Sequence, residues 1–226
     1  RGTTMHYVMS DIHGHRTRFD SIMDQIELKP NDKLFILGDV IDRNPDGLEI
    51  LLELKKKPNV RMLLGNHEHM MLDVLEHPGD GSKLRRWYRN GGDITHAKFE
   101  KMPSYLQDEI VSYLNKMEIN IDLKVGSQEY LLVHGAPMEY VHIWPYDFED
   151  PTTYAVWTRL EPYMKLKDGR VMIFGHTPTC NYQRGKPMKV WFGEDMIGID
   201  CGAAYDYRGR LACLRLEDME VFYSDH

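Results

Sequence analysis

The stretch Leu34-Phe35-Ile36-Leu37-Gly38-Asp39 decides the fold, because a short apolar run ends there at a glycine and a carboxylate. Apolar runs of this length between turn residues are typical of strands. Two further runs have the same form, at residues 7–9 before Asp11 and at residues 60–64 before Asn66. The segments between the runs carry apolar residues with helical spacing, at Phe19, Ile22, Met23 and Ile26 and at Leu48, Leu51, Leu52 and Leu54. This alternation predicts a β-sheet built from βαβ units with helices packed on it.

The rest of the chain predicts further helices and a second set of strands. Residues 77–118 are polar with interspersed aromatics, and we expect a variable helical insertion there, with loops near Pro78-Gly79 and Gly91-Gly92. A loop over residues 138–153 looks specific to this chain. Apolar runs separated by Gly, Pro and Asp predict strands at 119–125, 130–133, 171–174, 190–192, 197–199 and 211–216. We therefore expect one α/β domain over residues 1–226, a four-layer α-β-β-α sandwich of two mixed β-sheets flanked by helices.

Composition limits the classes of partner. The 226 residues have a net charge of -7 and a pI of about 5.9, which argues against stable nucleic-acid binding because that needs a positive surface. A small anionic substrate is compatible with this charge, since bound metals and a few arginines can reverse the local field. No signal peptide and no run of about 18 apolar residues is visible, so we expect a cytoplasmic protein without a membrane partner. Residues 1–4 are expected to be an addition ahead of a native start at Met5.

The cysteines predict no cross-link. Cys180, Cys201 and Cys213 are odd in number and form no CxxC pair. Free thiols in a reducing compartment are the expected state. No cysteine lies within the polar motifs described next, so a thiol nucleophile is not expected.

Five polar motifs follow apolar runs along the chain. They are Asp11-Ile12-His13-Gly14, Gly38-Asp39-Val40-Ile41-Asp42-Arg43, Gly65-Asn66-His67-Glu68, Val133-His134-Gly135 and Gly175-His176-Thr177. Open α/β sheets place ligands at the carboxyl ends of their strands, and loops held by a rigid sheet can bring distant residues to one point. The motifs together supply carboxylates, imidazoles and an amide, which is the ligand set of a two-metal hydrolytic site.

The residue types at these positions predict which ions bind. Asp11 and His13 are two residues apart and can approach one ion from a tight turn. The carboxylate of Asp39 has two oxygens and can bridge two ions about 3.5–4 Å apart. An amide oxygen and two imidazoles come from Asn66, His134 and His176. Mixed nitrogen and oxygen ligands suit Mn, Fe or Zn better than Mg or Ca, and the lack of a thiolate argues against a structural zinc site. We expect two divalent ions, manganese first, with iron or zinc as alternatives.

The ordered motifs resemble those of the metallophosphatase (calcineurin-like phosphoesterase) superfamily, specifically the phosphoprotein phosphatase family of serine/threonine phosphatases in its bacterial or phage form. The family pattern is Asp-x-His-Gly, Gly-Asp-x-x-Asp-Arg-Gly, Gly-Asn-His-Glu, His-Gly and Gly-His-Thr, and four of the five elements match. The second element has Asn44 in place of its last glycine. Because asparagine tolerates left-handed backbone angles, we expect the turn to persist. The resemblance runs from Tyr7 to about Leu216 and includes a similar segment at residues 199–203.

The resemblance implies a role for each matched residue. A first metal ion would be bound by Asp11, His13 and Asp39, and a second by Asp39, Asn66, His134 and His176. Arg43 and, by its position between the two later histidines, Arg159 would bind phosphate oxygens. His67 would be the general acid that protonates the leaving oxygen, and Asp42 would orient it. A water activated by the metals would attack phosphorus directly, with no phosphoenzyme.

We therefore expect a metal-dependent phosphomonoesterase, first of all a protein serine/threonine phosphatase. Its substrates would be phosphoproteins, phosphopeptides or small phosphate esters. An alternative is a dinucleoside polyphosphate hydrolase or a 2',3'-phosphodiesterase on the same site, since those relatives often vary around the second motif, where Asn44 lies. A catalytically silent binding module is disfavoured, because neither a metal ligand nor His67 has been lost. The helical insertion is expected to shape substrate choice.

Overall fold

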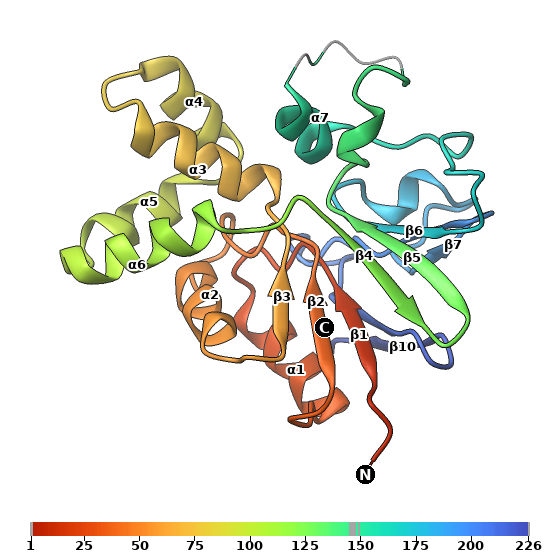
Figure 1. The fold of residues 1–226 in the computed structure, drawn as a ribbon. Helices are drawn as coiled ribbons and strands as arrows, with labels where there is room; N and C mark the ends of the chain where they lie inside the picture. The colour runs from red at the N-terminus through yellow and green to blue at the C-terminus, as the bar shows by residue number, and fades with distance from the viewer. Residues whose placement is uncertain (1, 145–147, 149, 226) are drawn as a thin grey trace.

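Two five-stranded β-sheets packed face to face form the centre of the molecule (Figure 1). The computed structural model describes residues 2–144, 148 and 150–225. The first sheet has the order β10-β9-β1-β2-β3 and the second the order β4-β5-β6-β8-β7. The first sheet consists of β1 (His6–Met9), β2 (Lys33–Ile36), β3 (Val60–Met62), β9 (Ala212–Arg215) and β10 (Glu220–Tyr223). The second consists of β4 (Asn120–Val125), β5 (Gln128–Val133), β6 (Val171–Phe174), β7 (Trp191–Phe192) and β8 (Met196–Gly198).

Both sheets are mixed. β1, β2 and β3 are parallel, and β9 and β10 extend that sheet in antiparallel pairing. In the second sheet β5, β6 and β8 are parallel, with β4 and β7 antiparallel at the two edges. Parallel strands place their carboxyl ends along one border of each sheet, and the five polar motifs follow the ends of β1, β2, β3, β5 and β6 there.

Alternate residues of the strands fill the space between the sheets. Val8 and Phe35 of the first sheet belong to one core with Leu132 and Ile173 of the second. Tyr7 and the other strand residues that alternate with Val8 and Phe35 point to the opposite face of the sheet, into a core shared with the helices. Because side chains along a strand alternate between its faces, the central strands β1 and β2 of the first sheet are buried on both sides. This explains the continuous apolar runs in its strands.

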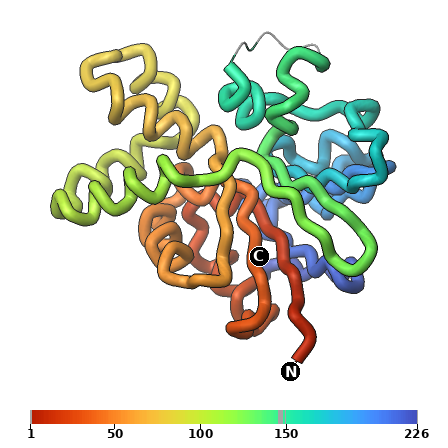
Figure 2. Tube along the Cα trace, in the orientation of Figure 1, coloured from red at the N-terminus to blue at the C-terminus, as the bar shows by residue number. Residues whose placement is uncertain are grey.

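Seven α-helices lie in the described part of the chain. They are α1 (Arg16–Ile26), α2 (Gly47–Lys55), α3 (Asn66–Glu76), α4 (Gly81–Arg89), α5 (Asp93–Glu100), α6 (Ser104–Asn115) and α7 (Pro151–Trp157). Helices α1 and α2 lie against the outer face of the first sheet (Figure 1), and α6 packs on α2 and α3. Helices α3–α6 project from one side of the molecule as a group (Figure 2). None of these helices combines the length and apolar character needed to span a bilayer.

The second sheet has a thinner outer layer. Its outer face packs against Tyr154 of α7 and against Leu160, Met164 and Leu166 from the irregular chain that follows. The prediction of two mixed sheets flanked by helices is confirmed, although the fourth layer contains only one short α-helix among the described residues.

Two elements differ from the expectations. Helix α7 begins inside the expected loop at 138–153, where Asp150 accepts a hydrogen bond from the Thr153 N–H at 2.9 Å and Pro151 occupies the first turn, a common way to start a helix. Residues 145–147 and 149 of that loop, like Arg1 and His226 of the expected domain, lie outside the described residues. Strand β10 was not predicted because it is a partly exposed edge strand without a continuous apolar run.

Candidate metal centre

Four of the expected metal ligands have a left-handed backbone. The φ angles of Asp11, His13, Asp39 and His176 are 56°, 47°, 57° and 65°. Side chains make this conformation costly, and it persists at functional sites where the surroundings enforce it. Adjacent strand ends supply that support, since Asp11 N–H donates to the Gly38 carbonyl and His13 N–H to the Asp39 carbonyl, both at 3.0 Å. The sharp turns aim these side chains at one place beyond the strand ends.

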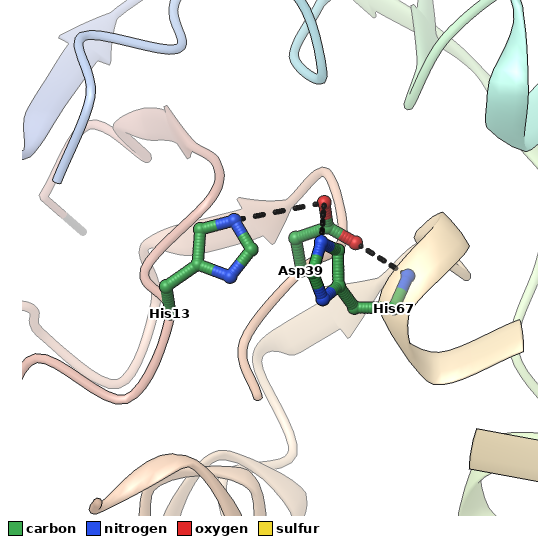
Figure 3. A group of neighbouring side chains, drawn as sticks. All are labelled: His13, Asp39 and His67. Atoms are coloured by element: carbon green, nitrogen blue, oxygen red, sulfur yellow. Dashed lines mark hydrogen bonds and ion pairs between the residues drawn. The ribbon is translucent and has the colours of Figure 1, made fainter. Parts of the chain in front are cut away.

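Asp39 lies at the centre of the cluster and is 2% exposed (Figure 3). Its Oδ2 lies 3.3 Å from His134 Nε2, 3.8 Å from His13 Nε2 and 4.0 Å from His67 Nε2. Its Oδ1 accepts the backbone N–H of His67 at 3.0 Å. One carboxylate oxygen is thus fixed by the protein and the other faces three imidazoles, as a shared metal ligand would.

Two sets of possible ligand atoms meet at Asp39. His13, Asp39 and His67 form one set and Asp39, His134 and His176 the other, with the atoms of each set within 4.8 Å of one another. Asp11 Oδ2 lies 3.8 Å from His13 Nε2 on the first side. Asn66 Oδ1 lies 2.9 Å from His134 Nε2 on the second. The structure therefore brings together all six predicted ligands.

Hydrogen bonds orient the imidazoles for metal binding. His13 Nδ1 donates to the Ile41 carbonyl at 2.9 Å, and His134 Nδ1 donates to the Leu37 carbonyl at 2.6 Å. His176 Nε2 donates to the Trp157 carbonyl at 3.0 Å. A carbonyl can only accept, so each imidazole turns its other nitrogen away from the carbonyl. Ligating histidines in metalloproteins are commonly held in this way.

The electrostatics of the cluster also fit divalent cations. Burial raises the pKa of Asp11, and the neighbouring carboxylates of Asp200 and Asp39 raise it further. Burial lowers the pKa of His176, which favours the neutral imidazole that a metal needs. Burial would lower the pKa of His134 as well, but Asp39 outweighs it and raises the pKa to about 10. A proton on His134 Nε2 thus stands where a metal ion could stand, between its nitrogen and the Asp39 and Asn66 oxygens.

The predicted general acid is held by a buried carboxylate. His67 Nδ1 lies 2.7 Å from Asp42 Oδ2, and both residues are at most 2% exposed. Burial would lower the pKa of His67, but the charge of Asp39 and the hydrogen bond to Asp42 outweigh burial and raise it. His67 Nε2 faces Asp39 and the cavity.

The cavity over the cluster is small and carries two arginines. It has a volume of about 60 Å³, and its lining includes Arg43, Arg159, Trp157 and Tyr205 as well as His67 and all of the predicted metal ligands except His134. Arg159 Nη1 lies 3.5 Å from the His176 carbonyl. Both predicted phosphate-binding arginines therefore border the space above the predicted metal ligands.

Glu68 is an important residue that the sequence reasoning did not assign. Its Oε1 accepts the N–H groups of Asp39 at 2.7 Å and Gly65 at 3.1 Å, and its Oε2 accepts those of Val40 at 3.0 Å and Ile41 at 3.3 Å. The signal was present, because Glu68 is three residues after Gly65, the capping-box position of a helix start. Glu68 fixes the loop that presents Asp39.

Asp200 and Trp87 were also missed. Asp200 follows β8, lines the cavity and is 6% exposed; its place after a strand run was a usable signal. Trp87 is fully buried, and its Nε1 donates to Asp42 Oδ2 at 2.8 Å. Nothing in the local sequence around Trp87 indicates this contact, which spans 45 positions.

The turn before Asn44 persists as expected, but not for the expected reason. Left-handed φ angles occur at Asp42 and Arg43, both 74°, whereas Asn44 does not have a positive φ. The Asn44 carbonyl instead packs against Gly14, where a Cβ would lie 2.8 Å from the Gly47 nitrogen. The turn therefore does not depend on an asparagine or glycine at position 44. His69, two residues after His67, does not line the cavity over the cluster.

Comparisons with known sequences match one family, and the names of the relatives refer to two different kinds of substrate. The family model "Calcineurin-like phosphoesterase" matches residues 7–198. Serine/threonine-protein phosphatase 2 of Salmonella typhimurium is 32% identical over 129 residues, which is 57% of this chain and 56% of the relative. The symmetrical bis(5'-nucleosyl)-tetraphosphatase of Wigglesworthia glossinidia brevipalpis is 45% identical over 69 residues, 30% of this chain and 25% of the relative. The matched segments thus span between a quarter and just over half of these relatives' lengths.

Solved structures share the fold over nearly the whole chain. A crystal structure provisionally described as a diadenosine tetraphosphatase has a TM-score of 0.67 at 17% identity, covering 98% of this chain and 93% of the other. A protein serine/threonine phosphatase from Saccharomyces cerevisiae has a TM-score of 0.61 at 12% identity, covering 99% and 80%. At these identities the likeness concerns the fold alone.

Proposed function

The chain belongs to the calcineurin-like phosphoesterase family, and from this premise we propose that it is a metal-dependent phosphomonoesterase acting on phosphoserine and phosphothreonine in proteins. The phosphoryl group would be transferred directly to water. This assignment is more specific than the family, and the arrangement around His67 is what favours it.

We assign the metal ligands from the two groups that share Asp39. Asp11, His13 and Asp39 would hold one ion, and Asp39, Asn66, His134 and His176 the other. When bound, two divalent ions would supply an activated water and would neutralise charge on the phosphate. The protein contributes their placement, through the carbonyls that orient His13 and His134 and through the carboxylate that anchors the Asp39 loop.

The His67–Asp42 pair is the observation that carries the proposal. An alkoxide from serine or threonine is a poor leaving group and needs a proton as the P–O bond breaks. His67 Nε2 faces the cavity and could donate that proton to the ester oxygen, while Asp42 Oδ2 holds Nδ1 at 2.7 Å. A nucleotide phosphate is a far weaker base and can leave without a proton. A general acid held this firmly therefore favours an alkyl phosphate ester over a dinucleoside polyphosphate.

The size of the cavity supports a substrate whose bulk stays outside. Pockets that enclose a drug-sized ligand usually measure about 300–1,000 Å³, whereas this cavity measures about 60 Å³. A phosphoryl group fits such a space, and Arg43 and Arg159 on its lining can bind phosphate oxygens. A phosphorylated side chain can reach in while the rest of a protein remains at the surface.

A dinucleoside polyphosphate hydrolase is the second candidate. It is favoured by relatives named symmetrical bis(5'-nucleosyl)-tetraphosphatase, which match about 70 residues of this chain at up to 45% identity. Those matches cover about a quarter of the relatives' length, so they compare only that part of the two proteins.

Turnover by metal-stripped protein with manganese added back would test the proposal. We expect phosphate release from a phosphothreonine peptide to exceed hydrolysis of diadenosine tetraphosphate. His67→Asn should lower turnover of the peptide by about 10²–10⁴-fold and turnover of p-nitrophenyl phosphate much less. His69→Asn, on the same helix but outside the cavity lining, is the matched control. Hydrolysis of the dinucleotide alone would refute the proposed substrate.

A further inference from the structure

The turn that carries Asp42 and Arg43 is held in an unusual conformation from outside. Both residues have φ angles of 74°, in the left-handed region that side chains disfavour. Asp42 is completely buried. Two consecutive residues of this kind need surrounding contacts to keep them in place.

Those contacts come from residues 87–95, at the end of α4 and the start of α5. Thr95 Oγ1 accepts the Asp42 N–H at 3.1 Å, and the Gly91 carbonyl accepts the Arg43 N–H at 3.0 Å. Trp87 Nε1 donates to Asp42 Oδ2 at 2.8 Å. Both backbone N–H groups of the turn and the carboxylate of Asp42 are thus bound by one segment.

Close packing makes this segment rigid. Gly91 has a φ angle of 91°, and a Cβ there would lie 2.7 Å from Arg43 Cγ. A Cβ on Gly92 would overlap the ring of Trp87. The glycine pair therefore lets the segment approach both Arg43 and Trp87 more closely than other residues could.

The carboxylate of Asp42 depends on Trp87 for its orientation. Its Oδ2 is shared by His67 Nδ1 and Trp87 Nε1. Its Oδ1 is buried and has no hydrogen-bond partner among the described residues. Without the indole N–H, the carboxylate would keep a single side-chain contact, to His67, and could rotate together with the imidazole.

We propose that residues 87–95 form a clamp, the 87–95 clamp, which positions the general acid through Asp42 and the phosphate-binding arginine through its backbone. Trp87 and Thr95 are positioning residues, because neither touches the reacting atoms. The inference rests on the proposed function in that it assumes His67 protonates the leaving group. It also assigns part of the 77–118 segment to catalysis in addition to any role in substrate choice.

Dependence of the rate on the leaving group tests the clamp. The manganese-loaded chain is assayed with p-nitrophenyl phosphate, phenyl phosphate and a phosphothreonine peptide. Trp87→Phe keeps an aromatic ring and removes the N–H donor. We expect kcat to fall about tenfold for phenyl phosphate and the peptide, the size of one hydrogen bond to a charged group, and less than about twofold for p-nitrophenyl phosphate. Bound manganese and inhibition by inorganic phosphate should not change.

Two controls separate positioning from stability. Trp191→Phe makes the same substitution in β7, where the indole stacks on Tyr182 with centroids 4.5 Å apart, and should leave all three rates unchanged. Thr95→Val removes the acceptor for the Asp42 N–H, whereas Thr95→Ser retains it. Thr95→Val should show the same selective loss and Thr95→Ser should not, which keeps the test open if Trp87→Phe fails to fold.

Equal losses on all three substrates, or no loss on any, with manganese retained would overturn the clamp. Failure of the proposed function looks different. If the unaltered protein hydrolyses the aryl phosphates but not the peptide, protein phosphatase activity is refuted. The ratio of phenyl phosphate to p-nitrophenyl phosphate turnover in Trp87→Phe would then still decide whether the clamp positions the general acid.

Discussion

Glu68→Gln should both destabilise the protein and weaken its metal centre. The carboxylate is fully buried and accepts four backbone N–H groups, two on each oxygen. Glutamine has nearly the same shape, but its amide nitrogen cannot accept a hydrogen bond. Whichever way the amide turns, two N–H groups of the loop will face a donor.

The expected loss follows from that count. A buried polar group left without its partner costs about 1–3 kcal/mol, so two of them should lower the free energy of unfolding by about 2–6 kcal/mol. Burial and the charge of Asp39 raise the pKa of Glu68 to about 7. Unfolding in urea should therefore be compared at about pH 8, where the ionised form that accepts all four bonds prevails. The raised pKa means that the buried charge itself costs stability at this pH, and neutral glutamine relieves that cost, so we expect a loss at the lower end of the range.

Metal affinity should fall with stability, because the Asp39 N–H loses its acceptor on Glu68. Residues that support metal ligands typically contribute about 10–100-fold to affinity, and we expect a loss in that range for manganese, measured by calorimetry. Glu76→Gln, at the exposed end of the same helix, is the control and should change stability by less than about 0.5 kcal/mol. Unaltered stability and unaltered manganese binding in Glu68→Gln would refute the reasoning.

Four further outcomes are expected. Asp39→Asn should abolish turnover and reduce bound manganese below two ions per chain; normal activity with two ions bound would rule out a bridging role. The pKa of His134 is raised to about 10 in the metal-free protein, so manganese must displace a proton and its affinity should rise with pH below that value. Calorimetry in buffers of different ionisation enthalpy should show the proton release, and a pH-independent affinity would contradict this. A thiol reagent should modify one cysteine per native chain, Cys180, because Cys201 and Cys213 are buried and burial raises the pKa of Cys201 to about 12; three rapid modifications would disagree. Arg43→Ala should weaken inhibition by inorganic phosphate by about tenfold or more, and unchanged inhibition would remove Arg43 from the phosphate site.

The proposed substrate preference depends on the geometry around His67. Relatives of this chain are named both serine/threonine-protein phosphatase 2 and symmetrical bis(5'-nucleosyl)-tetraphosphatase. In this chain His67 is held by Asp42, and Asp42 by Trp87. We infer that these two hydrogen bonds, from His67 and Trp87 to Asp42, determine how poor a leaving group can be expelled.

Much of the fold could be predicted because its strands are encoded locally. The runs at 7–9 and 34–37 are apolar at every position, and the run at 60–64 at every position but Arg61, since the central strands of the first sheet are buried on both faces. The helices that connect these strands, α1 and α2, carry apolar residues at a spacing that forms one buried face. The edge strand β10 lacks a continuous apolar run, because only part of it is buried.

The candidate site residues could also be predicted from the sequence, because the possible metal ligands lie in short motifs at strand ends. Asp11, Asp39, Asn66, His134 and His176 each come at or just after such an end, and the packing of the two sheets brings them together. The sequence did not reveal what holds those motifs in place. The turn at Asp42 was expected to persist because asparagine at position 44 tolerates left-handed angles, yet the left-handed residues are Asp42 and Arg43, and residues 87–95 bind their backbone N–H groups.

The sequence by itself determined most of the strand and helix order, except for α7 and β10, and the residue types offered to metal and phosphate, because these depend on local patterns of two to seven residues. Only the tertiary structure decided that Glu68 anchors the Asp39 loop and that Trp87 binds Asp42, 45 positions away. Such contacts join segments that are far apart in the chain, and the local pattern of each segment predicts only its own helix or strand. Which buried donor meets which buried acceptor is settled by packing, because the interior leaves no water to replace a missing partner.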